Sequence, residues 1–85
     1  MQFEGAVIRE QGVKFAIVVV KQHVVQNTAA GRRAISSFQP VFPGLPVVLM
    51  GQDCRGRASY LGRPDIVKFL SRVSIGRIPW KRFSI

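Results

Sequence analysis

One cysteine lies beside two cations, an arrangement that can produce a reactive thiol. Cys54 falls in a predicted turn (residues 53–56), next to Arg55 and close to Arg57. Nearby positive charge lowers the pKa of a thiol and raises its reactivity. Nucleophilic catalysis also requires a base and a group that orients it, and the single histidine, His23, is far away in the sequence. We therefore predict an inert turn cysteine.

The carboxylates and the histidine form no pattern that could bind a metal or transfer a proton. Glu4, Glu10, Asp53 and Asp65 fall in four different predicted elements. His23 ends an apolar segment, where a capping or half-buried role is usual, and a metal needs several ligands. We predict no catalytic residue, no metal and no cofactor, and hence a protein that is not an enzyme.

Positive charge is the most unusual feature of the composition. Thirteen Lys and Arg face four Asp and Glu, which gives a formal net charge of +9 and an isoelectric point near 11.5. Nucleic acid, an acidic protein face and an anionic membrane surface are the natural partners of such a chain. Arginine outnumbers lysine, which suits anion recognition, although a genome rich in arginine codons explains the same bias. Eight cations follow residue 50 and are the candidate nucleic-acid or anion-binding residues: Arg55, Arg57, Arg63, Lys68, Arg72, Arg77, Lys81 and Arg82.

Aromatic side chains are interleaved with these cations near the end of the chain. Trp80 and Phe83 alternate with Lys81 and Arg82, and Tyr60 lies in the predicted strand between Arg57 and Arg63. Cations that neutralise phosphates and rings that stack on bases are the components of single-stranded nucleic-acid binding. Tyr60 and Trp80 are therefore stacking candidates. The alternative is that the rings fill gaps in the core while the cations solvate the surface.

Two predicted hairpins supply the strands. Residues 3–9 and 13–21 are rich in β-branched side chains and flank the turn Glu10-Gln11-Gly12, where glycine allows a positive φ. Residues 13–21 and 47–51 contain apolar runs without alternation, the pattern of a strand buried on both faces. Residues 57–61 return from the second turn. We expect the two apolar runs to be central strands.

The first helix is predicted between the hairpins. Asn27 and Thr28 can cap its start, and its apolar stripe includes Ala34, Ile35 and Phe38 at helical spacing. Pro40 disfavours helix at the residue before it, so the helix should end near Phe38. The segment 23–25 before it either prolongs the preceding strand or begins a loop.

The second helix follows the second hairpin. Pro64 suits its first turn, and Asp65 complements the helix dipole there. Apolar residues at i, i+3, i+4 and i+7 run from Ile66 to Val73, and Gly76 is a plausible C′ residue. The tail, residues 77–85, is too aromatic to be simply disordered, so it should pack back on the core or add an edge strand.

The order of elements predicts one α+β domain spanning 1–85, with a core over 1–76 and a basic, aromatic tail over 77–85. We expect a β-β-α-β-β-α two-layer sandwich, in which about four strands form a sheet and both helices cover one face. The strand after the first helix could pair in parallel with 13–21 through a right-handed crossover. Strand order remains open at this point.

The second half of the chain resembles the C-terminal β-β-α unit of thioredoxin-like domains. The resemblance covers residues 46–50, the turn after them, residues 57–62 and the helix with Ile66, Phe69 and Leu70. In that family too, a proline opens a hydrophobic strand and a glycine closes the hairpin before the last helix. The redox Cys-x-x-Cys of the family is absent here. The resemblance therefore supports the architecture of this half and implies no redox function.

Location and function follow from what the chain has and lacks. The start does not read as a signal peptide, the longest apolar run is far shorter than the ~20 residues of a membrane span, and one cysteine cannot form an intramolecular disulfide. We expect a cytoplasmic location. The charge indicates a small non-catalytic protein that binds an acidic protein partner or self-associates, either as monomer or homodimer. The alternative is a nucleic-acid-binding module that uses the basic C-terminal half.

Overall fold

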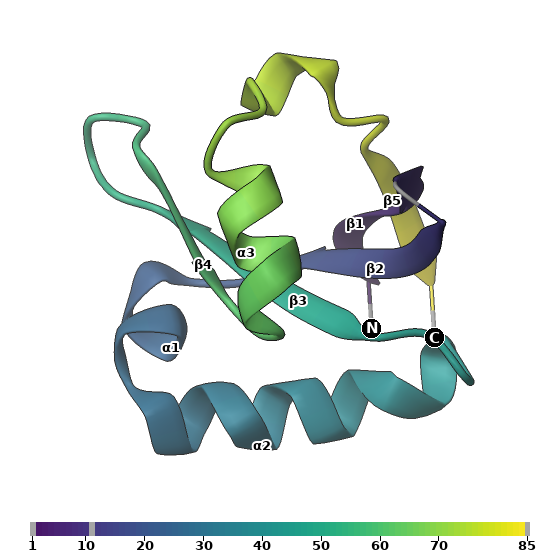
Figure 1. Ribbon diagram of the computed structural model, residues 1–85. Coiled ribbons are helices and arrows are strands. Elements are labelled where there is room, and N and C mark those ends of the chain that lie inside the picture. Colours follow the sequence, from purple (N-terminus) through teal and green to yellow (C-terminus); the bar gives the residue numbers. More distant parts are fainter. Residues whose placement is uncertain (1, 11, 85) are drawn as a thin grey trace.

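A mixed five-stranded sheet forms the centre of the protein (Figure 1). The computed structural model describes residues 2–10 and 12–84, so Gln11 of the predicted first turn lies outside the described residues. The strands are β1 (Gln2–Glu10), β2 (Val13–Val19), β3 (Val47–Gln52), β4 (Ala58–Leu61) and β5 (Lys81–Ser84). The helices are α1 (Gln22–Gln26), α2 (Thr28–Phe38) and α3 (Pro64–Leu70), with two 3₁₀ turns, η1 (Gln39–Val41) and η2 (Ile75–Arg77).

The strand order in the sheet is β4-β3-β2-β1-β5. β1 pairs antiparallel with β2 and with β5, and β3 pairs antiparallel with β4. β2 and β3 pair in parallel, with Ala16 opposite Val47 and Val19 opposite Met50. The α+β class, the two hairpins and the parallel pair of central strands are thus confirmed.

The sheet has five strands where the sequence predicted about four, because the tail contributes β5. Lys81–Ser84 pairs with the first residues of β1, Gln2 to Gly5. The ring of Phe83 stacks on that of Phe3, with centroids 5.2 Å apart, and meets Phe42 edge-on at 5.3 Å. The tail thus adds an edge strand, one of the two arrangements expected for it, although a four-residue strand with two exposed cations has no apolar run to mark its bounds. An aromatic anchor holds it in place.

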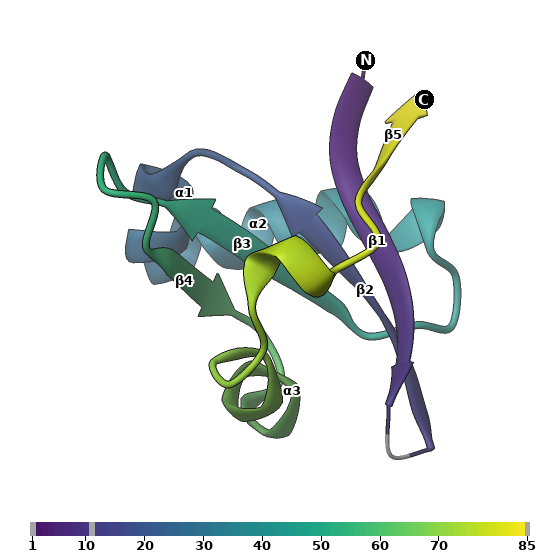
Figure 2. The ribbon, with the colours of Figure 1, turned by 90° about the horizontal axis from the view of Figure 1, so that it is seen from above.

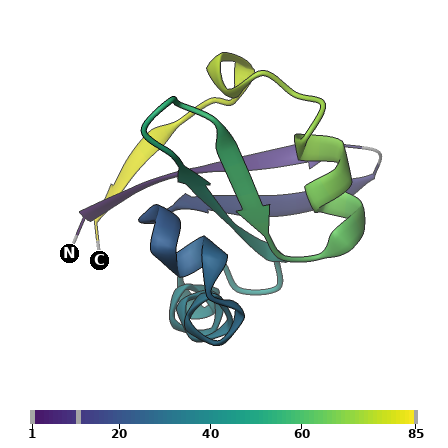
Figure 3. The same cartoon turned by 90° about the vertical axis from the view of Figure 1, so that its left-hand side faces the viewer.

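The helices cover both faces of the sheet, so the predicted two-layer arrangement was wrong. α1 and α2 lie on one side, while α3 and η2 lie on the other (Figures 1 and 3). Alternate residues of β2 serve both sides: Phe15 and Ile17 join the core cluster under α3, and Ala16 and Val18 join the one under α2. A strand that is apolar on both faces needs cover on both faces. The unbroken apolar run in β2 therefore already required three layers.

α2 begins and ends where the sequence predicted. The Asn27 Oδ1 atom accepts a hydrogen bond from the backbone N–H of Ala30 at 3.0 Å, and the helix ends at Phe38, before Pro40. The short helix α1 occupies the segment predicted as strand or loop. Its Val25 is buried against β3, which fixes this turn of helix beneath the sheet.

α3 begins at Pro64 as predicted but ends at Leu70, three residues before Val73. The hydroxyl of Ser71 donates to the backbone carbonyl of Lys68 at 2.7 Å, and the backbone N–H of Arg72 donates to Phe69. These local bonds close the helix early, so Gly76 falls in η2 rather than at a helix end. No helix in residues 2–10 and 12–84 is long and apolar enough to cross a membrane.

Candidate binding surface

The residues that could do covalent chemistry are dispersed. Cys54 is exposed in the turn between β3 and β4, and His23 is exposed on α1. Across the described residues, no three side chains among His, Cys, Asp and Glu gather as a metal site would require.

The tip of the β3–β4 hairpin presents two of the predicted cations on a braced turn. Asp53 Oδ1 accepts hydrogen bonds from the backbone N–H groups of Arg55 and Arg57, each at 2.9 Å. Gly56 takes the positive φ of 82° that the turn requires. The Asp53 carboxylate holds the turn by accepting these two backbone hydrogen bonds, and both arginine side chains are exposed to solvent.

A hollow of about 370 Å³ lies between β4 and the segment that follows α3. Apolar side chains line it together with Arg57 and two serines. Arg72 directly follows one lining residue, Ser71, and Arg77 lies two positions after another, Ile75. We call this site the β4–α3 hollow. Its lining residues are Arg57, Ala58, Tyr60, Leu70, Ser71, Val73, Ser74 and Ile75.

The other predicted cations do not all converge on this hollow. Arg63 is paired with Asp65, with Nε 2.9 Å from Oδ1, and it lines a separate hollow with Arg32 of α2. Lys68 is exposed on α3. The structure thus divides the basic C-terminal half among several surfaces.

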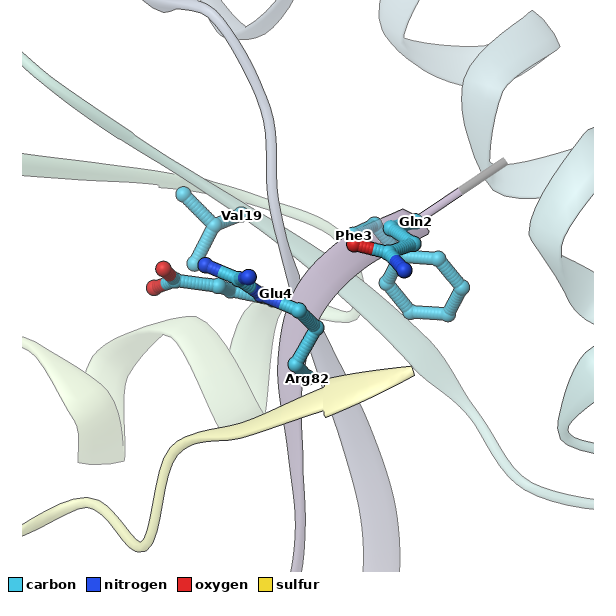
Figure 4. Close-up of a pocket in the computed structure, with 5 residues that line it drawn as sticks. All are labelled: Gln2, Phe3, Glu4, Val19 and Arg82. Atoms are coloured by element: carbon cyan, nitrogen blue, oxygen red, sulfur yellow. The ribbon is translucent and has the colours of Figure 1, made fainter. Parts of the chain in front are cut away.

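The two cations of β5 lie on opposite faces of the sheet. Arg82 is opposite Glu4 in the ladder, and both side chains extend to the same side, beside Val19, where they line an open depression (Figure 4). Lys81 alternates to the other face together with Phe83. It lines a hollow of about 250 Å³ with Val7, Pro79 and Phe83.

The two candidate stacking rings are held by the protein itself. Trp80 is half-buried against the core cluster under α3, and its indole N–H donates to the Ile75 carbonyl at 3.1 Å. Tyr60 packs on the same cluster, and burial raises the pKa of its phenol above 10.0. The Tyr60 hydroxyl is buried with no hydrogen-bond partner among the described residues. A stacking role for either ring stays a prediction.

Sequence reasoning missed a second basic surface, formed by the first hairpin. Arg9 lies directly opposite Lys14 in the β1–β2 ladder. By strand alternation both point to the face that carries Val7 and Lys81. The only signal in the sequence was the hairpin register, because the two cations belong to the half of the chain with the lower charge.

Comparison of the chain with protein-family models, with curated protein sequences and with solved structures gives no match.

Proposed function

We propose that this protein is a non-catalytic binding module that docks an acidic partner protein on the β4–α3 hollow. One observation carries the proposal: apolar side chains and an arginine line the same hollow. Leu70, Val73 and Ile75 line it together with Arg57, and Arg72 lies between two lining residues in the sequence. Specific protein interfaces have this anatomy, with an apolar centre and a polar rim.

The free charge of the surface supports an acidic partner. All thirteen Lys and Arg side chains are exposed, and among the residues described the only ion pair is Arg63–Asp65. Cations without internal partners attract a negatively charged protein over long range and raise the rate of association. The braced turn at Asp53 lowers the conformational cost of presenting Arg55 and Arg57.

A protein fits the β4–α3 hollow better than a nucleic-acid strand does. A nucleic acid presents phosphates and flat bases, and single-strand binding relies on rings that are free to stack. Trp80 and Tyr60 already pack on the core, and the Trp80 indole N–H is engaged. A protein segment can place an aliphatic side chain against Leu70, Val73 and Ile75 while carboxylates beside it pair with Arg57.

The test compares three labelled probes of equal charge by fluorescence anisotropy at about 50 mM salt, where electrostatic binding is strong. The probes are a peptide of eight glutamates, the same eight glutamates with a leucine inserted at the centre, and a mixed-sequence single-stranded oligonucleotide of the same charge. We expect the leucine peptide to bind tightest. Tighter binding of the oligonucleotide than of both peptides would show a nucleic-acid module and overturn the proposal.

Two double variants locate the site. Arg55→Glu with Arg57→Glu should weaken binding of the leucine peptide by about tenfold, which corresponds to ~1.4 kcal/mol. Arg32→Glu with Arg33→Glu is the matched control, since it changes the net charge equally on exposed positions of α2. If the control weakens binding as much, the peptide responds to net charge alone and the hollow is not the site.

A further inference from the structure

The outer edge of β1 is open only toward the closed end of the hairpin. Gln2 to Gly5 pair with β5, Ala6 is fully buried, and Val7 to Glu10 have ladder partners only on β2 among the described residues. Figure 2 shows β1 continuing past β5 toward the closed end of the hairpin. A row of unpaired backbone N–H and C=O groups on such an edge is a template for another strand.

The connection from η2 explains why β5 stops where it does. Continuing the β1–β5 register would place Trp80 opposite Ala6 and Pro79 opposite Val7. Proline has no N–H to donate to the ladder. The N–H of Trp80 instead donates to the carbonyl of Ile78 at 2.8 Å, and Ile78 is buried in the core. The chain therefore leaves the ladder here. Pro79 and Val7 line one hollow, and the segment adds no ladder partner to Val7 to Glu10 among the described residues.

The sheet face beside this edge is basic, and no carboxylate of the described residues lies on it. Phe3 and Gly5 face the α2 side of the sheet, because a Cβ on Gly5 would contact the rings of Phe3 and Phe83. By alternation, Val7 and Arg9 share that face. Glu10 points to the other face, where it lines a hollow with Phe15, Ile66 and Asp65.

Two strands add cations to the same face. Lys14 of β2 lies opposite Arg9, and Lys81 of β5 lies opposite Gly5. On β1, Val7 lies between Gly5 and Arg9, the residues opposite these two cations. It is 36% exposed, and no other large hydrophobic side chain among the described residues is exposed to this degree. We call this set the hairpin face: Val7, Arg9, Lys14 and Lys81.

Stability does not account for this arrangement. Like charges directly opposite one another on neighbouring strands destabilise a hairpin. A ligand that pairs with the open backbone edge and neutralises the cations would account for both features together.

We propose that the open edge of β1 accepts an extended acidic segment of a partner protein as an added strand. The backbone of the segment pairs with Val7 to Glu10, its carboxylates lie over Arg9, Lys14 and Lys81, and the aliphatic parts of its side chains cover Val7. Charge complementarity selects this occupant. A second copy of the chain would bring Arg9 and Lys14 of both copies together, and its net charge of +9 would repel the first.

Strand addition also specifies the pattern of the segment. Side chains of an added strand alternate between the two faces. Those on the hairpin face meet cations, and those on the opposite face meet Ile8 and Glu10. The segment should therefore carry acidic residues at every second position and apolar or neutral residues between them. Because the hairpin face and the β4–α3 hollow lie on opposite sides of the sheet, each site can be tested without the other.

The probe is an eight-residue peptide that alternates glutamate with valine. One control peptide has the same composition with its four glutamates consecutive. A second control carries N-methyl groups on every second residue, in both of the two possible registers, which removes the backbone donors that would face β1. Binding is measured by fluorescence anisotropy, and the amide resonances of Val7 to Glu10 are followed by NMR.

We expect the alternating peptide to bind at least about tenfold tighter than the clustered one, a difference of ~1.4 kcal/mol, and to shift the amide signals of β1. One N-methylated register should abolish binding. Arg9→Glu with Lys14→Glu should lose about tenfold in affinity, while Arg55→Glu with Arg57→Glu should change it less than about threefold. Arg9→Gln with Lys14→Gln provides a milder variant, and circular dichroism checks that each variant is folded.

Three results would overturn the proposal. The first is equal binding of the alternating peptide and both N-methylated forms, and the second is unchanged affinity in the Arg9 and Lys14 variants. The third is a wild-type dimer in sedimentation that the peptide does not dissociate, since the edge would then belong to a second copy. The leucine peptide is expected to bind at the β4–α3 hollow whichever of these results is obtained. Failure of this proposal is therefore distinguishable from failure of the proposed function.

Discussion

At the residue scale, two side chains occupy positions that cost stability. Arg9 lies opposite Lys14, so two like charges share one rung of the ladder. The Tyr60 hydroxyl is buried without a partner among the described residues, and a buried polar atom without a hydrogen bond carries a desolvation cost. Both positions border a surface that we propose to bind a partner. Local costs of this kind are most readily tolerated where they serve binding.

Replacing Arg9 should separate stability from binding. Arg9→Glu converts a repulsive cross-strand pair with Lys14 into an attractive one, so the free energy of unfolding should rise by ~0.2–1 kcal/mol. Arg9→Gln should give an intermediate value. Urea denaturation measures both, and the gain should shrink at about 1 M NaCl because salt screens exposed charges. A loss of stability in Arg9→Glu would mean that Arg9 and Lys14 do not share a face.

Removing the Tyr60 hydroxyl should change the alkaline limb of the stability curve. Burial raises the pKa of Tyr60 in the folded state above its value of 10.0 in the unfolded chain. The contribution of Tyr60 to the free energy of unfolding is therefore fully present below pH 10 and is lost as pH rises through the folded pKa. Tyr60→Phe should not lower stability at neutral pH, and its stability should fall less steeply above pH 10. If the Tm values of the wild-type protein and of Tyr60→Phe fall equally steeply with pH above 10, this prediction is wrong.

At the element scale, local bonds decide where elements begin and end. Asn27 caps α2 with its side chain, and Asp53 holds the β3–β4 turn through two backbone N–H groups. The hydroxyl of Ser71 closes α3 at Leu70. The first two of these residues were recognisable from the sequence as a cap and a turn residue. The early end of α3 was not, because the apolar spacing continues to Val73.

The cap of α2 can be tested directly. Asn27→Ala removes the acceptor for the N–H of Ala30, so the free energy of unfolding should fall by about 1 kcal/mol. Asn27→Asp should retain the cap and suit the positive end of the helix dipole. Thr28→Ala, the next position along, is the control and should have a much smaller effect. Equal losses in Asn27→Ala and Thr28→Ala under chemical denaturation would show that the cap bond does not contribute.

At the scale of the whole molecule, three layers separate the charged surfaces. The sheet places the β4–α3 hollow on one side and the hairpin face on the other. Glu4, Glu10 and Asp65 lie on the α3 side, so the charged side chains that the described residues place on the hairpin face are all cations. The fold thus divides the net charge of +9 among separate surfaces, and both the β4–α3 hollow and the hairpin face combine cations with apolar side chains.

Salt should stabilise this protein at low ionic strength. A net charge of +9 with one ion pair among the described residues means that repulsion between cations opposes the compact state. Raising NaCl from about 0.01 to about 0.15 M shortens the screening length from ~30 to ~8 Å. The Tm measured by differential scanning calorimetry should therefore rise. Lys21→Glu with Arg33→Glu lowers the net charge and should flatten the dependence, whereas a falling Tm in the wild-type protein would contradict the argument.

The sequence by itself determined the class of the fold and most of its elements. Period and propensity are local properties, so the Val-rich runs of β2 and β3, the cap at Asn27 and the stop before Pro40 could be read directly. The charge was equally plain. Of the candidate site, the exposed turn with Arg55 and Arg57 was predictable because Asp53 and Gly56 have turn chemistry.

Only the tertiary structure decided which surfaces these residues form. β5 exists because Phe83 stacks on Phe3, eighty positions earlier in the chain, and no local pattern encodes such a contact. The division of the helices between two faces follows from covering both sides of β2, which is a requirement of the assembled sheet. Arg9, Lys14 and Lys81 meet through strand register and alternation. For that reason the basic surface with an open edge lies partly in the half of the chain where the charge is lower.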